Sequence, residues 1–129
     1  MRKPISTPSA PPPIGPYSQG MIADQFVYTA EEGGASPDGK LPPDVPGQTN
    51  NALNNIEAIL KGGGCSLADV VRVTVYLSDL SDFTAMNNVY GTRFPKPYPV
   101  RSIIQTALPA PGAKVAMDAI AIRGDHGKP

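Results

Sequence analysis

The clearest pattern along the chain is an alternation of apolar and polar residues in segment 70–77. This segment is rich in β-branched side chains, which favour strands, and its apolar residues recur with a period of two. The alternation predicts a strand with one buried face, formed by Val71, Val73, Val75 and Leu77.

Four further segments have the length and composition of strands. Segments 18–22 and 26–30 are short and lie on either side of a turn. Segments 101–107 and 114–122 close the chain, on either side of a turn at 108–112. Prolines fall between these periodic segments, which is typical of element boundaries.

Two segments carry the 3.6-residue period of an amphipathic helix. The first runs from about Val45 to Lys61 and ends at the triple glycine 62–64, and the second begins near Leu80 and stops before Pro95. The apolar positions that set the period are Leu53, Ile56, Ile59 and Leu60 in the first helix, and Leu80, Phe83, Met86 or Asn87, and Tyr90 in the second.

The order of elements is two strands, a helix, a strand, a helix and two strands. It predicts an α+β fold with one mixed sheet and both helices on one face. The other face needs cover, because strands such as 70–77 are apolar on more than one side, and self-association is the natural way to supply it. At 129 residues we expect a single domain, with a proline-rich arm at 1–12 and a tail at 124–129.

Composition narrows the classes of partner. Eleven basic and eleven acidic residues give a formal net charge of zero without a basic run, which argues against nucleic-acid binding. The single cysteine, Cys65, excludes an intrachain disulfide and a multi-cysteine metal site. The N-terminus has no apolar signal-peptide region, and no apolar segment is long enough to span a membrane. We therefore expect a cytoplasmic protein.

Arg101 is the main candidate for ligand binding. It lies in the sequence Pro99-Val100-Arg101-Ser102, at the start of the predicted strand 101–107. A guanidinium group is always charged, and its planar fork of donors matches a carboxylate at two points. A surface ion pair would also explain an arginine here, so the position alone leaves both interpretations open.

A set of short motifs runs through most of the chain, from about Pro11 to Ile122. The motifs are Pro13-Ile14-Gly15-Pro16-Tyr17-Ser18-Gln19-Gly20; Gln48 with Leu53-Asn54-Asn55-Ile56; Asp69 to Leu77; Asp82-Phe83 with Met86-Asn87 and Tyr90; Pro99-Val100-Arg101-Ser102; and Leu108-Pro109.

This set of motifs resembles the YjgF/RidA family, many of whose members carry the label L-PSP endoribonuclease. The resemblance implies a chorismate mutase-like fold and a homotrimer with three clefts between subunits. It also implies hydrolysis of reactive enamine or imine carboxylates, such as 2-aminoacrylate, to the 2-keto acid and ammonia. The substrate is then a small carboxylate, and no cofactor or metal is expected.

The resemblance also implies roles for residues of this chain. Arg101 matches the arginine that binds the substrate carboxylate, Tyr17 matches the cleft tyrosine, and Asn87 matches the asparagine of the second helix. Such a carboxylate clamp orients the imine for attack by water. Positioning alone supplies a large share of the lowering of the activation barrier.

The chain departs from the family pattern at three places. Where the last strand usually reads Val-Glu-Ile-Glu, with the first Glu handling water and proton, this chain has Ala116 and Asp118 at the two Glu positions. The usual Ser-Gly-Gln after the second strand is replaced by Ala30-Glu31-Glu32, and a cysteine common two residues after the arginine is Ile103. The resemblance thus implies a substrate site with Ala30, Ile103 and Ala116 in it, but without the usual proton-transfer group.

Two interpretations of the missing glutamate stay open. In the favoured one, Ala116 leaves the position vacant and deamination is weak, because a positioned general acid or base contributes about 10²- to 10⁴-fold. In the other, Glu31 or Glu32 has taken over as a catalytic residue. Asp118 is a further candidate for this role, because it lies on the same strand face as Ala116, but it is one pleat repeat away and shorter than glutamate. His126, the only histidine, is expected in a solvent-facing tail.

Three functions are compatible with these residues. The preferred one is RidA-like hydrolysis of small enamine or imine carboxylates with altered proton chemistry. The second is a noncatalytic protein that binds small carboxylates. The third is an endoribonuclease, which a single tail histidine and the lack of a basic run disfavour.

Overall fold

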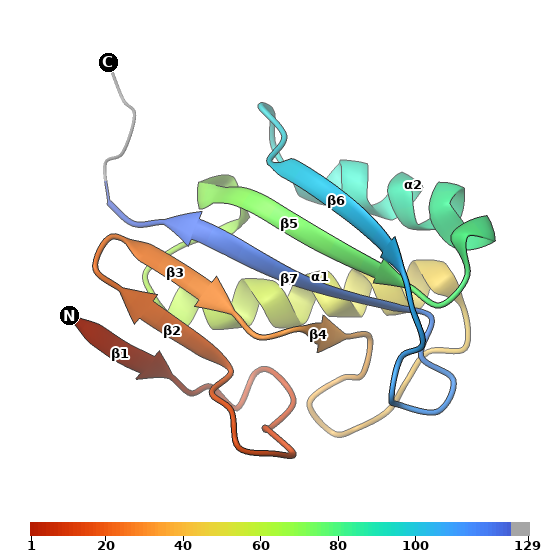
Figure 1. Cartoon of the computed structure of the whole chain (residues 1–129), viewed down its shortest axis with the longest axis horizontal. Coiled ribbons are helices and arrows are strands. Elements are labelled where there is room, and N and C mark those ends of the chain that lie inside the picture. The colour runs from red at the N-terminus through yellow and green to blue at the C-terminus, as the bar shows by residue number, and fades with distance from the viewer. Residues whose placement is uncertain (125–129) are drawn as a thin grey trace.

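A computed structural model describes residues 1–124, which form one mixed sheet and two α-helices (Figure 1). The strands are β1 (Arg2–Ile5), β2 (Gly20–Ala23), β3 (Phe26–Thr29), β4 (Glu32–Gly33), β5 (Val70–Leu77), β6 (Val100–Gln105) and β7 (Val115–Ile122). The sheet order is β1-β2-β3-β7-β5-β6, and β4 pairs with β7 outside this path. Only β5 and β6 are parallel, because a helix crosses over between them.

The helices are α1 (Val45–Gly62) and α2 (Phe83–Arg93), with short 3₁₀ turns η1 (Leu67–Asp69) and η2 (Leu80–Asp82). Asp44 caps α1, since its carboxylate accepts a hydrogen bond from the Gly47 N–H at 2.7 Å. The helix ends in the triple glycine, where Gly64 adopts a φ of +80° that a side chain would disfavour. Within residues 1–124 no helix is long and apolar enough to cross a membrane.

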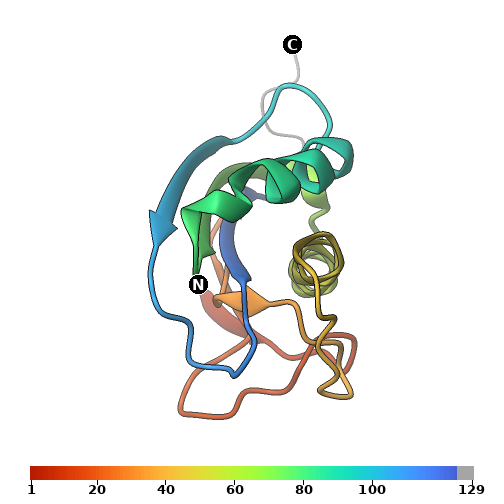
Figure 2. The ribbon, with the colours of Figure 1, turned by 90° about the vertical axis from the view of Figure 1, so that its right-hand side faces the viewer.

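Both helices pack on one face of the sheet, as predicted (Figure 2). The core lies between these two layers, and Cys65 is buried at its margin as a small core residue. The main core side chains on α1, β5 and β7 are Leu53, Ile56, Ile59, Leu60, Val73, Val75, Leu77, Val115 and Met117.

Two strands are present that the sequence pattern does not predict. β1 lies within the segment 1–12 that was expected to be a proline-rich arm, and it pairs antiparallel with β2. β4 is only two residues long and pairs with β7, with Glu32 opposite Met117 and Gly33 opposite Ala116. The remaining predicted segments occur with their ends shifted by at most three residues, the largest shift being at η2, where the first turn of the predicted second helix is 3₁₀.

The uncovered face of β5 is more polar than predicted. A bulge at 70–72 shifts the register, so Val71 is 41% exposed instead of sharing a face with Val73. The side chains of β5 on the uncovered face are Arg72, Thr74 and Tyr76. Apolar surface on this face comes instead from other strands, at Tyr28, Ile104 and Ile120.

Gln48 ties α1 to the turn that precedes β7. Its Nε2 donates to the carbonyls of Pro42 and Gly112 at 2.9 and 3.0 Å, and its Oε1 accepts from the Lys114 N–H at 2.7 Å. The side chain is completely buried. The side-chain amide of Gln48 therefore supplies the hydrogen-bond partner of three backbone groups.

Replacement of Gln48 should destabilise the fold by about 3 kcal/mol. In Gln48→Leu, an apolar side chain of similar size leaves two carbonyls and one N–H without their partners. Urea unfolding at one fixed protein concentration measures the loss. Gln105→Leu is the matched control, because Gln105 is exposed and accepts a single hydrogen bond, from the Leu80 N–H. The control should lose less than about 1 kcal/mol, and equal losses in the two variants would contradict the role of Gln48.

Candidate functional site

The site residues proposed from the sequence fall into two cavities of the single chain. The arginine pocket has a volume of about 350 Å³ and is lined by Asn87, Tyr90, Gly91, Tyr98 and Arg101. The glutamate cavity has a volume of about 570 Å³ and is lined by residues of segments 11–17, 31–41 and 110–113, among them Tyr17, Glu31 and Glu32. None of the described residues lines both cavities.

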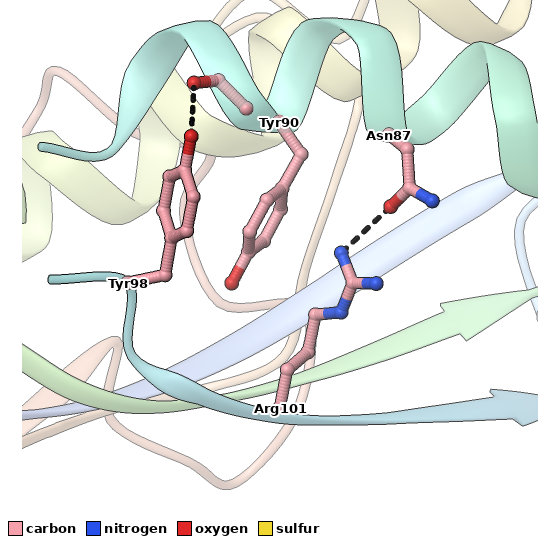
Figure 3. Close-up of a pocket in the computed structure, with 5 residues that line it drawn as sticks. Asn87, Tyr90, Tyr98 and Arg101 are labelled. Atoms are coloured by element: carbon pink, nitrogen blue, oxygen red, sulfur yellow. Dashed lines mark hydrogen bonds between the residues drawn. The ribbon is translucent and has the colours of Figure 1, made fainter. Parts of the chain in front are cut away.

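Arg101 is held in its pocket by side chains of α2 (Figure 3). Its Nη1 donates a hydrogen bond to Oδ1 of Asn87 at 2.7 Å, and its guanidinium carbon lies 4.7 Å from the ring centre of Tyr90. Phe83 is slightly farther, at 5.7 Å. Within residues 1–124 no carboxylate forms an ion pair with Arg101. Neutral groups thus position the arginine, and its charge is left for a ligand.

The register of the sheet explains where Arg101 points. Arg101 lies opposite Val73 of β5, whose side chain is buried beneath the helices, so Arg101 projects toward the helical layer. Ile103 follows on the same face, where it is half-buried and packs against the core. Because β6 is the edge strand of the sheet, the arginine pocket opens at the rim of the molecule.

Two tyrosines line this pocket that the sequence analysis did not assign to it. The Tyr90 hydroxyl is buried and has no hydrogen-bond partner among the described residues. Burial raises the pKa of Tyr90 to about 12, although the charge of Arg101 acts in the opposite direction. The Tyr98 hydroxyl donates to the Gly91 carbonyl at 3.5 Å (Figure 3). In the sequence, Tyr90 was noted as a helix position and as part of a motif, without a role in a site. The available signal for Tyr98 was its place directly before the Pro-Val-Arg motif.

Tyr17 enters the glutamate cavity from the loop between β1 and β2, and about half of its surface is exposed. Gln19 pins this loop, since its Nε2 donates to the carbonyls of Thr7 and Pro11 at 3.1 and 2.9 Å, and its Oε1 accepts from the Thr7 N–H at 2.7 Å. The carbonyl of Gln19 in turn accepts from the Ala30 N–H at 2.8 Å. Ala30 directly precedes Glu31 in the chain, but it is not among the residues that line the cavity.

Glu31 and Glu32 give the cavity an acidic wall. Glu32 is only 5% exposed, and burial, with a smaller contribution from the charge of Glu31, raises the pKa of Glu32 to about 7. Burial and the charge of Asp118 also raise the pKa of Glu31. Asp118 itself accepts a hydrogen bond from the Tyr76 hydroxyl at 2.8 Å. Within residues 1–124 no group of histidine, cysteine and carboxylate side chains is arranged to hold a metal ion.

Ala116 lies between β4 and β5, opposite Gly33 on one side and Tyr76 on the other. It faces the uncovered side of the sheet together with Asp118, so the predicted common face of these two residues is correct. Arg101 projects from the opposite side. One chain thus brings Arg101 and Asn87 together but keeps them apart from Tyr17, Glu31, Glu32 and Ala116, and His126 lies outside the described residues.

Comparison with known proteins finds relatives over nearly the whole chain. A sequence model described as endoribonuclease L-PSP matches residues 7–123. The 2-iminobutanoate/2-iminopropanoate deaminase of Capra hircus is 41% identical over 126 residues, which cover 96% of this chain and 92% of that protein. The crystal structure of RidA from Psychrobacter sp. superposes with a TM-score of 0.89 at 34% identity, covering 94% of this chain and 99% of that one.

A second solved structure, E. coli TdcF with bound serine, gives a TM-score of 0.88 at 36% identity and covers 95% of this chain and 99% of that one. The fold, the motifs and these similarities extend over nearly the same residues. The chain therefore belongs to the YjgF/RidA family, whose sequence model is described as endoribonuclease L-PSP.

Proposed function

We propose that this protein hydrolyses small enamine and imine carboxylates to the 2-keto acid and ammonia. The observation that carries the proposal is Arg101, a half-buried guanidinium that Asn87 and Tyr90 position and that has no carboxylate partner within residues 1–124. The similarity to proteins named 2-iminobutanoate/2-iminopropanoate deaminase supports this reaction. The serine bound to the related TdcF supports a ligand that carries a carboxylate.

The chemistry needs little beyond orientation and proton transfer. The guanidinium fork of Arg101 binds both carboxylate oxygens of the substrate, which fixes the adjacent C=N carbon for attack by water. Asn87 accepts a hydrogen bond from one N–H group of Arg101 and keeps the remaining guanidinium N–H groups directed toward the pocket. Tyr90 and Tyr98 supply an aromatic wall for a short side chain, so the pocket suits small substrates.

We propose further that the working site is shared between copies of the chain in a homotrimer. The arginine pocket is at the β6 edge, while the glutamate cavity is formed by loops next to β4, and no described residue connects them. A sheet face without helices carries Tyr28, Ile104 and Ile120 and needs cover. Association through that face would place the cavities of neighbouring copies in one cleft.

Loss of the arginine should impair turnover. Arg101→Ala should reduce the release of ammonia and pyruvate from 2-aminoacrylate, generated in situ, by at least tenfold, because charge-assisted hydrogen bonds to the carboxylate are lost. Arg101→Lys should also be impaired, since an ammonium cannot reproduce the planar fork. Arg123→Ala removes a partly buried arginine next to β7, outside the arginine pocket, and serves as the control with unchanged rate.

Calorimetry with 2-ketobutyrate separates binding from turnover. Wild type should bind this keto acid at least tenfold more tightly than Arg101→Ala. Equal affinities would rule out the carboxylate clamp. Tight binding to wild type without any release of ammonia would identify a noncatalytic carboxylate-binding protein instead of an enzyme.

Sedimentation equilibrium at micromolar concentration should give the mass of three chains of 13.5 kDa. Ile104→Lys places a charge on the uncovered sheet face and should shift the protein toward the monomer, because burial of an unpaired charge in an interface is costly. A stable monomer of wild type at this concentration would contradict the proposal of a shared site.

A further inference from the structure

Gly91 lies within α2 at a position where the fold does not require a glycine. It belongs to the helix and is not among the glycines with a positive φ, so its backbone suits any residue. A Cβ added at Gly91 would have no neighbour within 4 Å apart from the adjoining backbone of α2. Alanine would therefore fit and would favour the helix, because glycine loses more conformational freedom on folding. The glycine keeps space open at a cost to the helix.

The space at Gly91 belongs to the arginine pocket. Gly91 lines this pocket and follows Asn87 by four residues, so the two residues lie on the same face of α2, one turn apart. The side chain of Asn87 accepts the hydrogen bond from Arg101 at 2.7 Å. A side chain at position 91 would therefore project beside Asn87 toward the same pocket. The pocket thus extends along α2 from the guanidinium to Gly91, over about 5.4 Å of helix.

Aromatic rings form the walls of this part of the pocket. The hydroxyl of Tyr98 donates to the Gly91 carbonyl at 3.5 Å, which places the Tyr98 ring at this end (Figure 3). About half of the Tyr98 surface is exposed, so much of its ring is free for contact. Tyr90 is only 5% exposed and packs against Phe94 with 4.6 Å between ring centres, so it forms a closed floor. Aromatic walls of this kind favour an aromatic partner.

The other end of the pocket carries the positive charge of Arg101. No carboxylate within residues 1–124 forms an ion pair with this guanidinium, and none of the described residues that line the pocket is acidic. The volume of about 350 Å³ is in the range of pockets that hold organic ligands. A short acid such as 2-ketobutyrate has only an ethyl group to place in it. An anionic head with a planar apolar tail matches the whole pocket better.

We propose that Gly91 determines specificity, by admitting carboxylates with an aromatic side chain to the arginine pocket. The carboxylate binds Arg101, and the ring lies against Tyr98 in the space that Gly91 leaves open. This inference rests on the proposed function for the carboxylate clamp. It extends the substrates from 2-imino acids with a short side chain to those with a benzyl group. Gly91 acts only through the room that it leaves and takes no part in proton transfer.

Calorimetry with two keto acids that differ only in their side chain tests the size of the pocket. Wild type should bind phenylpyruvate at least tenfold more tightly than 2-ketobutyrate, because the ring buries more apolar surface. Arg101→Ala should weaken the binding of both acids, since they share the carboxylate. The two corresponding imines, formed in situ, should show the same preference in kcat/KM.

Filling the space at Gly91 should remove this preference. In Gly91→Leu the affinity for phenylpyruvate should fall at least tenfold, while the affinity for 2-ketobutyrate stays within threefold. Gly91→Ala adds one methyl group and should lose less affinity, yet its midpoint of urea unfolding should rise, because alanine favours the helix. Weaker binding with greater stability cannot come from misfolding. Thr92→Leu is the matched control with unchanged affinities, because Thr92 is the next residue of α2, exposed and outside the pocket.

The outcomes separate this inference from the proposed function. Equal affinity of wild type for both acids, or an unchanged preference in Gly91→Leu, overturns the role of Gly91 and leaves the Arg101 clamp standing. A Gly91→Leu variant that sediments as a monomer while wild type is a trimer also overturns it, because the glycine would then admit a second copy. A wild type that binds neither acid overturns both proposals. Ring-selective binding without release of ammonia overturns only the deaminase.

Discussion

The attachment of α1 to the backbone next to β4 is the constraint on which the rest of this structure depends. Asn51 and Asn55 bind carbonyls of residues 33–35, and Gln48 binds the turn before β7. The approach is so close that a Cβ at Gly34 would lie 2.5 Å from Cα of Gln48. Only glycine fits at this point, because such a contact could be relieved only by moving the backbone of the helix.

This attachment has a chemical consequence for the cavity beside it. The donors of the helix are used by backbone carbonyls, which are obligatory acceptors once they are buried. Glu32 accepts no hydrogen bond from a described residue and lines the cavity, and only 5% of its surface is exposed. These contacts hold residues 33–35 against the helix, next to the largely buried Glu32, and burial raises the pKa of Glu32 to about 7.

The sequence predicts the long elements well and the short ones poorly. β5, β7 and α1 have enough residues for a period to be recognised, and their buried faces follow it from Val73 onward and from Leu53 to Leu60. β1 and β4 exist because a neighbouring strand pairs with them, and a two-residue strand has no period at all. The bulge that exposes Val71 is likewise a property of the pairing with β7 and not of the local sequence.

The candidate site likewise contains residues that the sequence predicts and features that it does not. Arg101 and Asn87 were found through the motifs of the chain, and their contact follows from the crossover of α2 between two parallel strands. The contribution of Tyr90 was missed, because a tyrosine at helical spacing is indistinguishable from a core residue until its hydroxyl is placed. The sequence named Glu31 and Glu32 together, but burial, which separates a solvated glutamate from one with an altered pKa, is a tertiary property.

In the shared site proposed above, the separation of the arginine pocket from the glutamate cavity makes activity depend on protein concentration. An enzyme whose two cavities must come together from different copies has no complete site when it is diluted below the dissociation constant of its assembly. Its specific activity then falls with dilution although every chain remains folded. Substitutions on the uncovered sheet face could change the rate without touching either cavity, and mixtures of two inactive variants, one defective in each cavity, could regain part of it.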